Sequence, residues 1–182
     1  ARICFHAANS AAIFRLPGAH FDMVRPGLAA YGYWSGEPAM RPTGLRPILR
    51  VVSSLAAVRP LPEGHAVGYG CTFRTSRASR IGVVPVGYAD GYRRSLGNAA
   101  EMILPAVRGR ARAVVPVVGR VSMDLVTLDV TGVPDVQVGD PVIVMDDDPA
   151  SPNSVEALAR RLGTIPYEMT CLIGQRVQRL LV

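Results

Sequence analysis

Lysine is absent from this sequence: all 20 of its basic side chains are arginine. No side chain of the chain can therefore form a Schiff base with a carbonyl compound. Its three cysteines, Cys4, Cys71 and Cys171, are an odd number and lie far apart, which argues against a disulfide framework. We expect reduced thiols in the core of a cytoplasmic protein. The three histidines share no ligand spacing with the cysteines, so no structural metal is expected.

Long apolar runs are also missing. No run approaches the roughly 20 residues that span a bilayer, and the first residues, ARICFHAANS, lack the pattern of a signal peptide. The net charge of +6 permits contact with polyanions. A basic β-barrel that binds nucleic acid or mediates assembly is thus an alternative, but aromatic residues for base stacking make up only 6% of the chain. We expect neither a nucleic-acid nor a membrane partner.

Residues 1–34 contain two strand–loop–helix patterns, RICFHAANSAAIFRL and FDMVRPGLAAYGY, with Asn9 or Ser10 placed to cap the first helix. Such units are typical of the end of an α/β array, for example the last units of a barrel. A complete barrel needs about 250 residues, so most of one is missing. Residues 35–48 are rich in proline and glycine and predict a linker.

From residue 49 onward, short β-rich runs alternate with turn signals, which predicts an all-β barrel or sandwich. A helix is expected over residues 154–162, capped by Asn153 or Ser154 and stopped by Gly163, and a final strand over residues 171–182. The basic turn RGRAR at residues 108–112 is expected on the surface. The fold class is therefore mainly β: a C-terminal β-barrel or sandwich-like domain (residues 46–182) preceded by a fragment of a (β/α)8 barrel with its linker (residues 1–45).

Two loops at the ends of adjacent strands suggest an anion site. In HAANSAA the Ser10 hydroxyl lies at a helix start, and in VRPGLAAYG the Gly27 and Leu28 amides lie at a turn. Ser10 alone would be read as an ordinary helix cap. Arg25, before that turn, is either a solvated arginine or one directed into a barrel mouth.

Other candidates come from the β-rich part. HAVGYGCTF is a strand-like stretch in which Gly68 and Gly70 flank Tyr69, which indicates either a bend or a close approach to the phenol. Tyr88 in PVGYADGYRR, Met123 in VVGRVSMDLV and Tyr167 in GTIPYEM are, taken singly, ordinary turn or core residues.

The order of these motifs is more specific than any one of them. HAANSAA, VRPGLAAYG, VGYGCTF, PVGYADGYRR, VVGRVSMDLVTLDVT, VGDPV and GTIPYE resemble the alanine racemases from residue 3 to about residue 179. The resemblance implies a homodimeric bacterial enzyme that interconverts L- and D-alanine with pyridoxal 5'-phosphate and supplies D-alanine for peptidoglycan. Each subunit of that family has an N-terminal (β/α)8 barrel, most of which this chain lacks, and a C-terminal β domain.

The resemblance also assigns roles. It makes Tyr69 the catalytic tyrosine, which reaches into the partner's barrel and exchanges a proton with the substrate α-carbon opposite the cofactor lysine. Arg25 bonds the pyridine nitrogen, and His6 lies beside the cofactor. The phosphate contacts are Ser10, Gly27, Leu28 and Tyr167, and the substrate contacts are Met123 and Tyr88.

The cofactor lysine of the family lies in the missing part of the barrel. We therefore expect the chain alone to be inactive and to need the N-terminal half of the barrel, a second subunit and alanine. A racemase of the same fold with broader substrate specificity is the other enzyme that this sequence allows.

Overall fold

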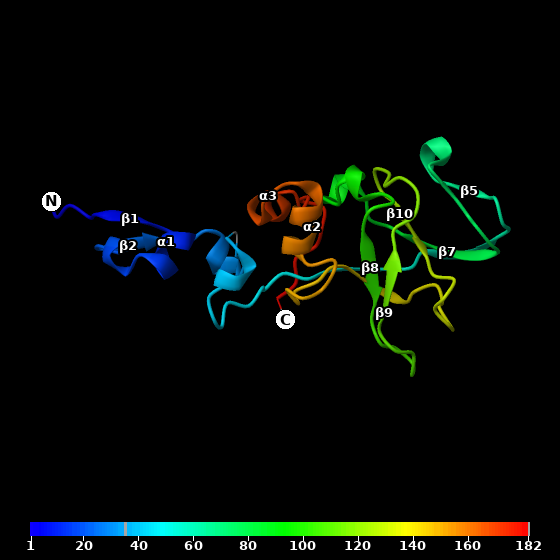
Figure 1. Ribbon diagram of the computed structural model, residues 1–182, viewed down its shortest axis with the longest axis horizontal. Coiled ribbons are helices and arrows are strands. Elements are labelled where there is room, and N and C mark those ends of the chain that lie inside the picture. Colours follow the sequence, from blue (N-terminus) through cyan, green and yellow to red (C-terminus); the bar gives the residue numbers. More distant parts are fainter. Residues whose placement is uncertain (35, 182) are drawn as a thin grey trace.

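The computed structural model describes residues 1–34 and 36–181 (Figure 1). Ser35, in the expected linker, and Val182, in the expected last strand, lie outside the described residues. The helices are α1 (Ser10–Arg15), α2 (Val155–Leu162) and α3 (Pro166–Cys171), with short 3-10 turns η1 (Pro17–Ala19), η2 (Leu28–Tyr31), η3 (Pro38–Met40), η4 (Tyr69–Cys71), η5 (Tyr88–Asp90) and η6 (Arg94–Leu96).

The N-terminal part is a parallel pair of strands, β1 (His6–Asn9) and β2 (Met23–Arg25), at one end of the molecule (Figure 1). Asn9 caps α1, since its Oδ1 accepts a hydrogen bond from the Ala12 amide at 3.1 Å. The two expected strands and the helix between them are therefore present.

Two antiparallel sheets and a hairpin form the rest. One sheet has the order β10-β7-β4 and the other β3-β11-β8-β9, while β5 and β6 form a separate two-stranded pair. The strands are β3 (Val51–Ser54), β4 (Ala57–Leu61), β5 (Ala66–Val67), β6 (Phe73–Arg74), β7 (Ser79–Val84), β8 (Glu101–Leu104), β9 (Ala113–Pro116), β10 (Val126–Asp129) and β11 (Pro141–Met145).

One hydrophobic core joins both sheets to the C-terminal helices. Its fully buried members include Met102 of β8, Leu128 of β10, Val144 of β11 and Leu158 of α2. The buried positions of the strands are mostly Val, Ile, Leu and Met, which suit a pleated, half-buried surface. The prediction of a mainly β fold is confirmed.

Helix α2 begins and ends where the sequence predicts. The Ser154 hydroxyl accepts from the Ala157 amide at 3.2 Å, and Gly163 closes the helix in the left-handed conformation (φ 67°). The linker and the residue before it are fastened to this helix, because Arg41 and the Trp34 amide both donate to the buried Glu156 carboxylate, at 2.5 and 3.3 Å.

Two expectations are wrong. Residues 172–181 form turns and irregular backbone in place of a final strand, because α3 runs to Cys171 and the chain then turns at Gly174. All three cysteines are exposed, because each lies in a turn, at a helix end or in an uncovered segment. The stretch HAVGYGCTF is a hairpin whose tip is η4, so the strand-like run is interrupted by a bend at Tyr69, which the sequence allows as one of two readings.

Candidate active site

The four predicted phosphate contacts lie close together. The Ser10 hydroxyl is buried and accepts hydrogen bonds from the amides of Gly27 at 2.9 Å and Ala29 at 3.2 Å. Leu28, between them, is buried at the start of η2. A Cβ atom placed on Gly27 would lie 3.6 Å from the Tyr167 ring and 3.9 Å from the Ser10 oxygen. The ends of β1 and β2 thus bring together the loops that the sequence indicated, with α3 supplying the tyrosine.

Arg25 and His6 lie on the neighbouring strands. Arg25 ends β2, and its Nη2 donates to the Ala7 carbonyl of β1 at 3.4 Å, so the guanidinium lies over the parallel pair. His6 begins β1 opposite Met23. Both side chains are exposed in this chain, and their predicted contacts with a cofactor stay predictions.

Tyr88 and Met123 come from different loops that are joined by backbone hydrogen bonds. The Tyr88 amide donates to the Ser122 carbonyl, and the Ala89 amide donates to the Met123 carbonyl, both at 3.1 Å. Both side chains are exposed. The structure therefore pairs the two predicted substrate contacts and directs them toward solvent in this chain.

Tyr69 is 73% exposed at the tip of the β5–β6 hairpin. The hairpin is fastened to the β domain by Asn98, whose Nδ2 donates to Thr72 Oγ1 at 3.0 Å and whose Oδ1 accepts from the Gly119 amide at 2.6 Å. An exposed phenol on an anchored turn can reach a second molecule without reorganising the domain.

The glycines beside Tyr69 have a structural reason. Gly68 and Gly70 have φ of 74° and 71°, which side chains other than glycine rarely adopt. A Cβ on Gly68 would lie 3.2 Å from the Arg120 amide nitrogen, and one on Gly70 would lie 3.1 Å from Arg120 Nη1. The glycines therefore serve the bend and the approach of Arg120. The bend that the sequence allows is present, whereas a close approach to the Tyr69 phenol stays a prediction.

The predicted residues do not converge on one point within the chain. The β5–β6 hairpin and the β1–β2 pair lie toward opposite ends of the molecule (Figure 1). Tyr69 therefore does not lie beside Ser10 or Arg25 of its own chain.

Sequence reasoning passed over Arg176, which joins the Tyr88 loop to the Met123 loop. Its Nε and Nη2 donate to the two carboxylate oxygens of Asp90 at 2.6 and 3.0 Å, and Nη2 also donates to Asp124 at 2.7 Å. Burial alone would raise the pKa of Asp90, but hydrogen bonds from Arg176 and the Gly87 amide outweigh it and lower that pKa. No local motif marks Arg176, since its partners lie 52 and 86 residues away.

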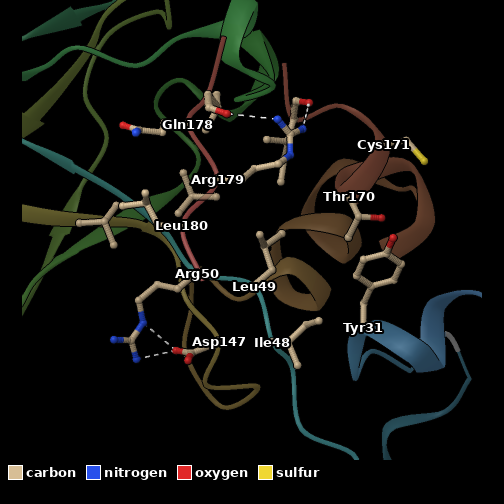
Figure 2. A pocket seen from close by; sticks show the side chains of 14 residues that line it. Tyr31, Ile48, Leu49, Arg50, Asp147, Thr170, Cys171, Gln178, Arg179 and Leu180 are labelled. Carbon is tan, nitrogen blue, oxygen red and sulfur yellow. Dashed lines mark hydrogen bonds and ion pairs between the residues drawn. The ribbon is translucent and has the colours of Figure 1, made fainter. Parts of the chain in front are cut away.

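A pocket of about 670 Å³ lies elsewhere, between residues 48–52 and residues 177–180 (Figure 2). Its lining is mostly apolar, and Arg50 on its wall donates through Nε to Asp147 at 2.8 Å. None of the predicted site residues lines it, so the pocket is separate from the candidate site.

The described part of the chain offers no group of three or more His, Cys, Asp or Glu side chains that could hold a metal ion. Among the same residues, no helix has both the length and the apolar character needed to cross a membrane.

Comparison with known proteins agrees with the motif order. The family model described as "Alanine racemase, C-terminal domain" matches residues 48–181, and "Alanine racemase, N-terminal domain" matches residues 1–35. An alanine racemase of Desulfovibrio desulfuricans is 42% identical over 179 residues, which are 97% of this chain and 45% of that protein. Alanine racemase 1 of Clostridium acetobutylicum is 39% identical over 178 residues, with the same shares. The chain thus spans about 45% of the length of these curated relatives.

Solved structures of alanine racemases also resemble this chain over nearly its whole length. An alanine racemase of Bacillus anthracis, with bound L-Ala-P, has a TM-score of 0.86 at 31% identity, covering 98% of this chain and 45% of that one. One of Bartonella henselae, with covalently bound pyridoxal phosphate, has a TM-score of 0.84 at 31% identity, covering 100% and 48%.

Proposed function

Because the chain belongs to the alanine racemase family and corresponds to its C-terminal part, we propose that it supplies the β domain and the last barrel units of an enzyme that interconverts L- and D-alanine. The match of the C-terminal family model to residues 48–181 carries the proposal. Residues 1–45 would be the barrel fragment with its linker and residues 46–182 the β domain. By the same resemblance the enzyme would act in the bacterial cytoplasm and supply D-alanine for peptidoglycan.

Ser10, Gly27, Leu28 and Tyr167, here called the Ser10 cluster, fit the phosphate of pyridoxal phosphate. The cluster offers a buried hydroxyl, the Leu28 amide at the start of η2 and a tyrosine, which are common phosphate contacts, and the Gly27 amide holds the Ser10 hydroxyl in place between the two loops. Ser10, Gly27, Leu28 and Tyr167 would hold the phosphate. When bound, the cofactor withdraws electrons from the substrate α-carbon and so makes its proton acidic.

Arg25 and His6 would lie along the cofactor ring. An arginine stays protonated and offers only donors, so Arg25 would bond a ring nitrogen that carries no proton. His6, on the adjacent strand, would lie beside the same ring.

Tyr69 would act on the substrate of a second subunit. Racemisation requires one group to remove the α-proton and another to deliver a proton to the opposite face. Tyr69 would serve one face, and a lysine from the part of the enzyme that this chain lacks would serve the other. The distance between the β5–β6 hairpin and the barrel fragment in one chain supports an arrangement in which two subunits share each site (Figure 1). Met123, through its amide, would meet the substrate carboxylate, and Tyr88 would line the entrance from the same subunit.

The test replaces Tyr69 in a full-length racemase that contains this chain. Tyr69→Phe removes only the hydroxyl, and we expect racemisation to fall by roughly 10²–10⁴-fold with folding and cofactor binding unchanged. Tyr31→Phe, at another exposed tyrosine outside the candidate site, is the matched control. Retention of activity in Tyr69→Phe would refute the role of Tyr69.

Two further measurements complete this test. Mixing Tyr69→Phe subunits with subunits that lack the cofactor lysine should restore activity if the site is shared, because such a heterodimer has one intact site. No recovery despite demonstrated subunit exchange would contradict sharing. Assays with other amino acids would distinguish an alanine racemase from one of broader specificity.

A further inference from the structure

Three chain segments that are distant in sequence meet at the Arg176 guanidinium. Its Nε and Nη2 donate to both oxygens of Asp90, at 2.6 and 3.0 Å, and Nη2 also donates to Asp124 at 2.7 Å. Arg176 itself lies five residues beyond the end of α3. One side chain therefore connects η5, the loop after Met123 and the segment that follows α3.

The ion pairs continue into the backbone of the loop. Asp90 Oδ2 also accepts a hydrogen bond from the Gly87 amide at 2.9 Å, and the Asp90 carbonyl accepts from the Gly174 amide at 3.2 Å. A displacement of the Asp90 carboxylate would therefore move both ends of η5, the turn that begins with Tyr88.

The same loop holds the Met123 turn. The Tyr88 and Ala89 amides donate to the carbonyls of Ser122 and Met123. Asp124, the next residue, is the second carboxylate on Arg176. The Tyr88 loop and the Met123 loop are thus joined twice, by the Arg176 guanidinium and by these two backbone hydrogen bonds.

We propose that Arg176 is a positioning residue that sets the Tyr88 phenol and the Met123 amide relative to each other, and so controls how tightly the enzyme holds its amino-acid substrate. This inference rests on the proposed function of those two residues. In this role Arg176 acts through its bonds to Asp90 and Asp124. A planar guanidinium can serve two oxygens of one carboxylate and a second carboxylate together, which a lysine ammonium does less well.

The first test measures backbone hydrogen exchange in this 182-residue chain. Arg176→Gln should speed exchange of the Tyr88 and Ala89 amides by roughly three- to tenfold, because the loop then opens more readily. Arg176→Lys should give an intermediate rate. The control is Arg50→Gln, since Arg50 has a side chain that is 50% exposed, against 51% for Arg176, and it also lies between two carboxylates. Unchanged rates in Arg176→Gln, or an equal increase in Arg50→Gln, would overturn the proposal.

The second test uses the full-length racemase. Arg176→Gln should raise KM for alanine by roughly three- to tenfold and change kcat less, since the loops bind substrate and do not carry the proton. Rescue by Arg176→Lys should be partial. An unchanged KM in an active enzyme would refute the inference.

The two tests also separate the inference from the function on which it rests. If the wild-type enzyme does not racemise any amino acid, the proposed function fails, while the exchange rates still decide whether Arg176 orders the loops. Should Arg176→Gln fail to fold, Asp124→Asn removes the charge of one exposed partner and must change both readouts in the same direction, or the proposal is wrong.

Discussion

Asp140 is a buried carboxylate on which the stability of the β domain should depend. It precedes β11, its side chain is 0% exposed, and Arg110 donates to Oδ2 at 2.6 Å. Arg108 donates to the other oxygen, and the Gln137 amide donates to Oδ2 at 3.1 Å. These bonds fasten the β8–β9 hairpin to the start of β11.

The expected effect of Asp140→Asn follows from this environment. Burial alone would raise the pKa of Asp140, but the bonds from Arg110, Arg108 and the Gln137 amide outweigh it and lower the pKa to about 2, from an ordinary value of 3.8. Such a difference between folded and unfolded states stabilises the fold by about 2 kcal/mol at neutral pH. The variant also leaves the buried Arg110 without its charged partner, which costs up to about 3–5 kcal/mol. We expect a loss of about 2–4 kcal/mol at pH 7.

The pH dependence of the free energy of unfolding shows whether the ionised Asp140 carboxylate causes the stabilisation. Because the folded pKa is the lower one, the stabilisation is fully present above about pH 5 and is lost as the pH falls through 4 toward 2. Urea unfolding of the wild-type chain, Asp140→Asn and the exposed control Glu63→Gln, at pH 7, 5 and 3, measures this. The gap between wild type and Asp140→Asn should be constant from pH 7 to 5 and smaller at pH 3. A gap below about 0.5 kcal/mol, within the range of ordinary surface substitutions, or one that does not change with pH, would refute the reasoning.

Three further substitutions test the fold and the linker. Leu128→Ala should lower the free energy of unfolding by roughly 2–5 kcal/mol, measured by urea unfolding, whereas Leu180→Ala at an exposed position should change it little; equal effects would contradict the assigned core. Gly68→Ala should cost roughly 1–2 kcal/mol and speed hydrogen exchange across the β5–β6 hairpin, and slow exchange there would rule out the strain at its φ of 74°. Glu156→Gln should destabilise by about 2 kcal/mol or more and shift the emission of Trp34, the single tryptophan, to longer wavelength; unchanged emission would show that the linker is held by other contacts.

The sequence predicts a helix or strand correctly where residues within or next to that element determine it. The caps of α2 are the residues next to it in the sequence, and the β-branched runs mark the strands. The order β3-β11-β8-β9 could not be read in this way, since it depends on which strands pack together across the core. The expected last strand is absent for a related reason: residues 172–176 are tied to η5 through Gly174 and Arg176, and within the described part of the chain they pair with no strand.

The same distinction holds for charged residues. The sequence predicts the turn at residues 108–112 on the surface, because a short arginine-rich turn is usually solvated. Arg110 is nevertheless buried, because it donates to the buried carboxylate of Asp140. Asp140 lies 30 residues further along the chain, so no local pattern reveals this pair. By contrast, the grouping of Ser10 with Gly27 could be predicted, since the ends of two adjacent parallel strands lie at the same edge.

The position of Arg176 has a consequence for a shared site. Tyr167 lies in α3, in contact range of the barrel fragment, whereas Tyr88 and Met123 extend from the β domain. If each site takes Tyr167 from one subunit and the two loops from the other, then α3 and the loops of one chain belong to different sites. The segment after α3 joins them through Gly174 and Arg176 within a few residues. The bidentate pair with Asp90 would then join the end of α3 at one site to the two loops at the other.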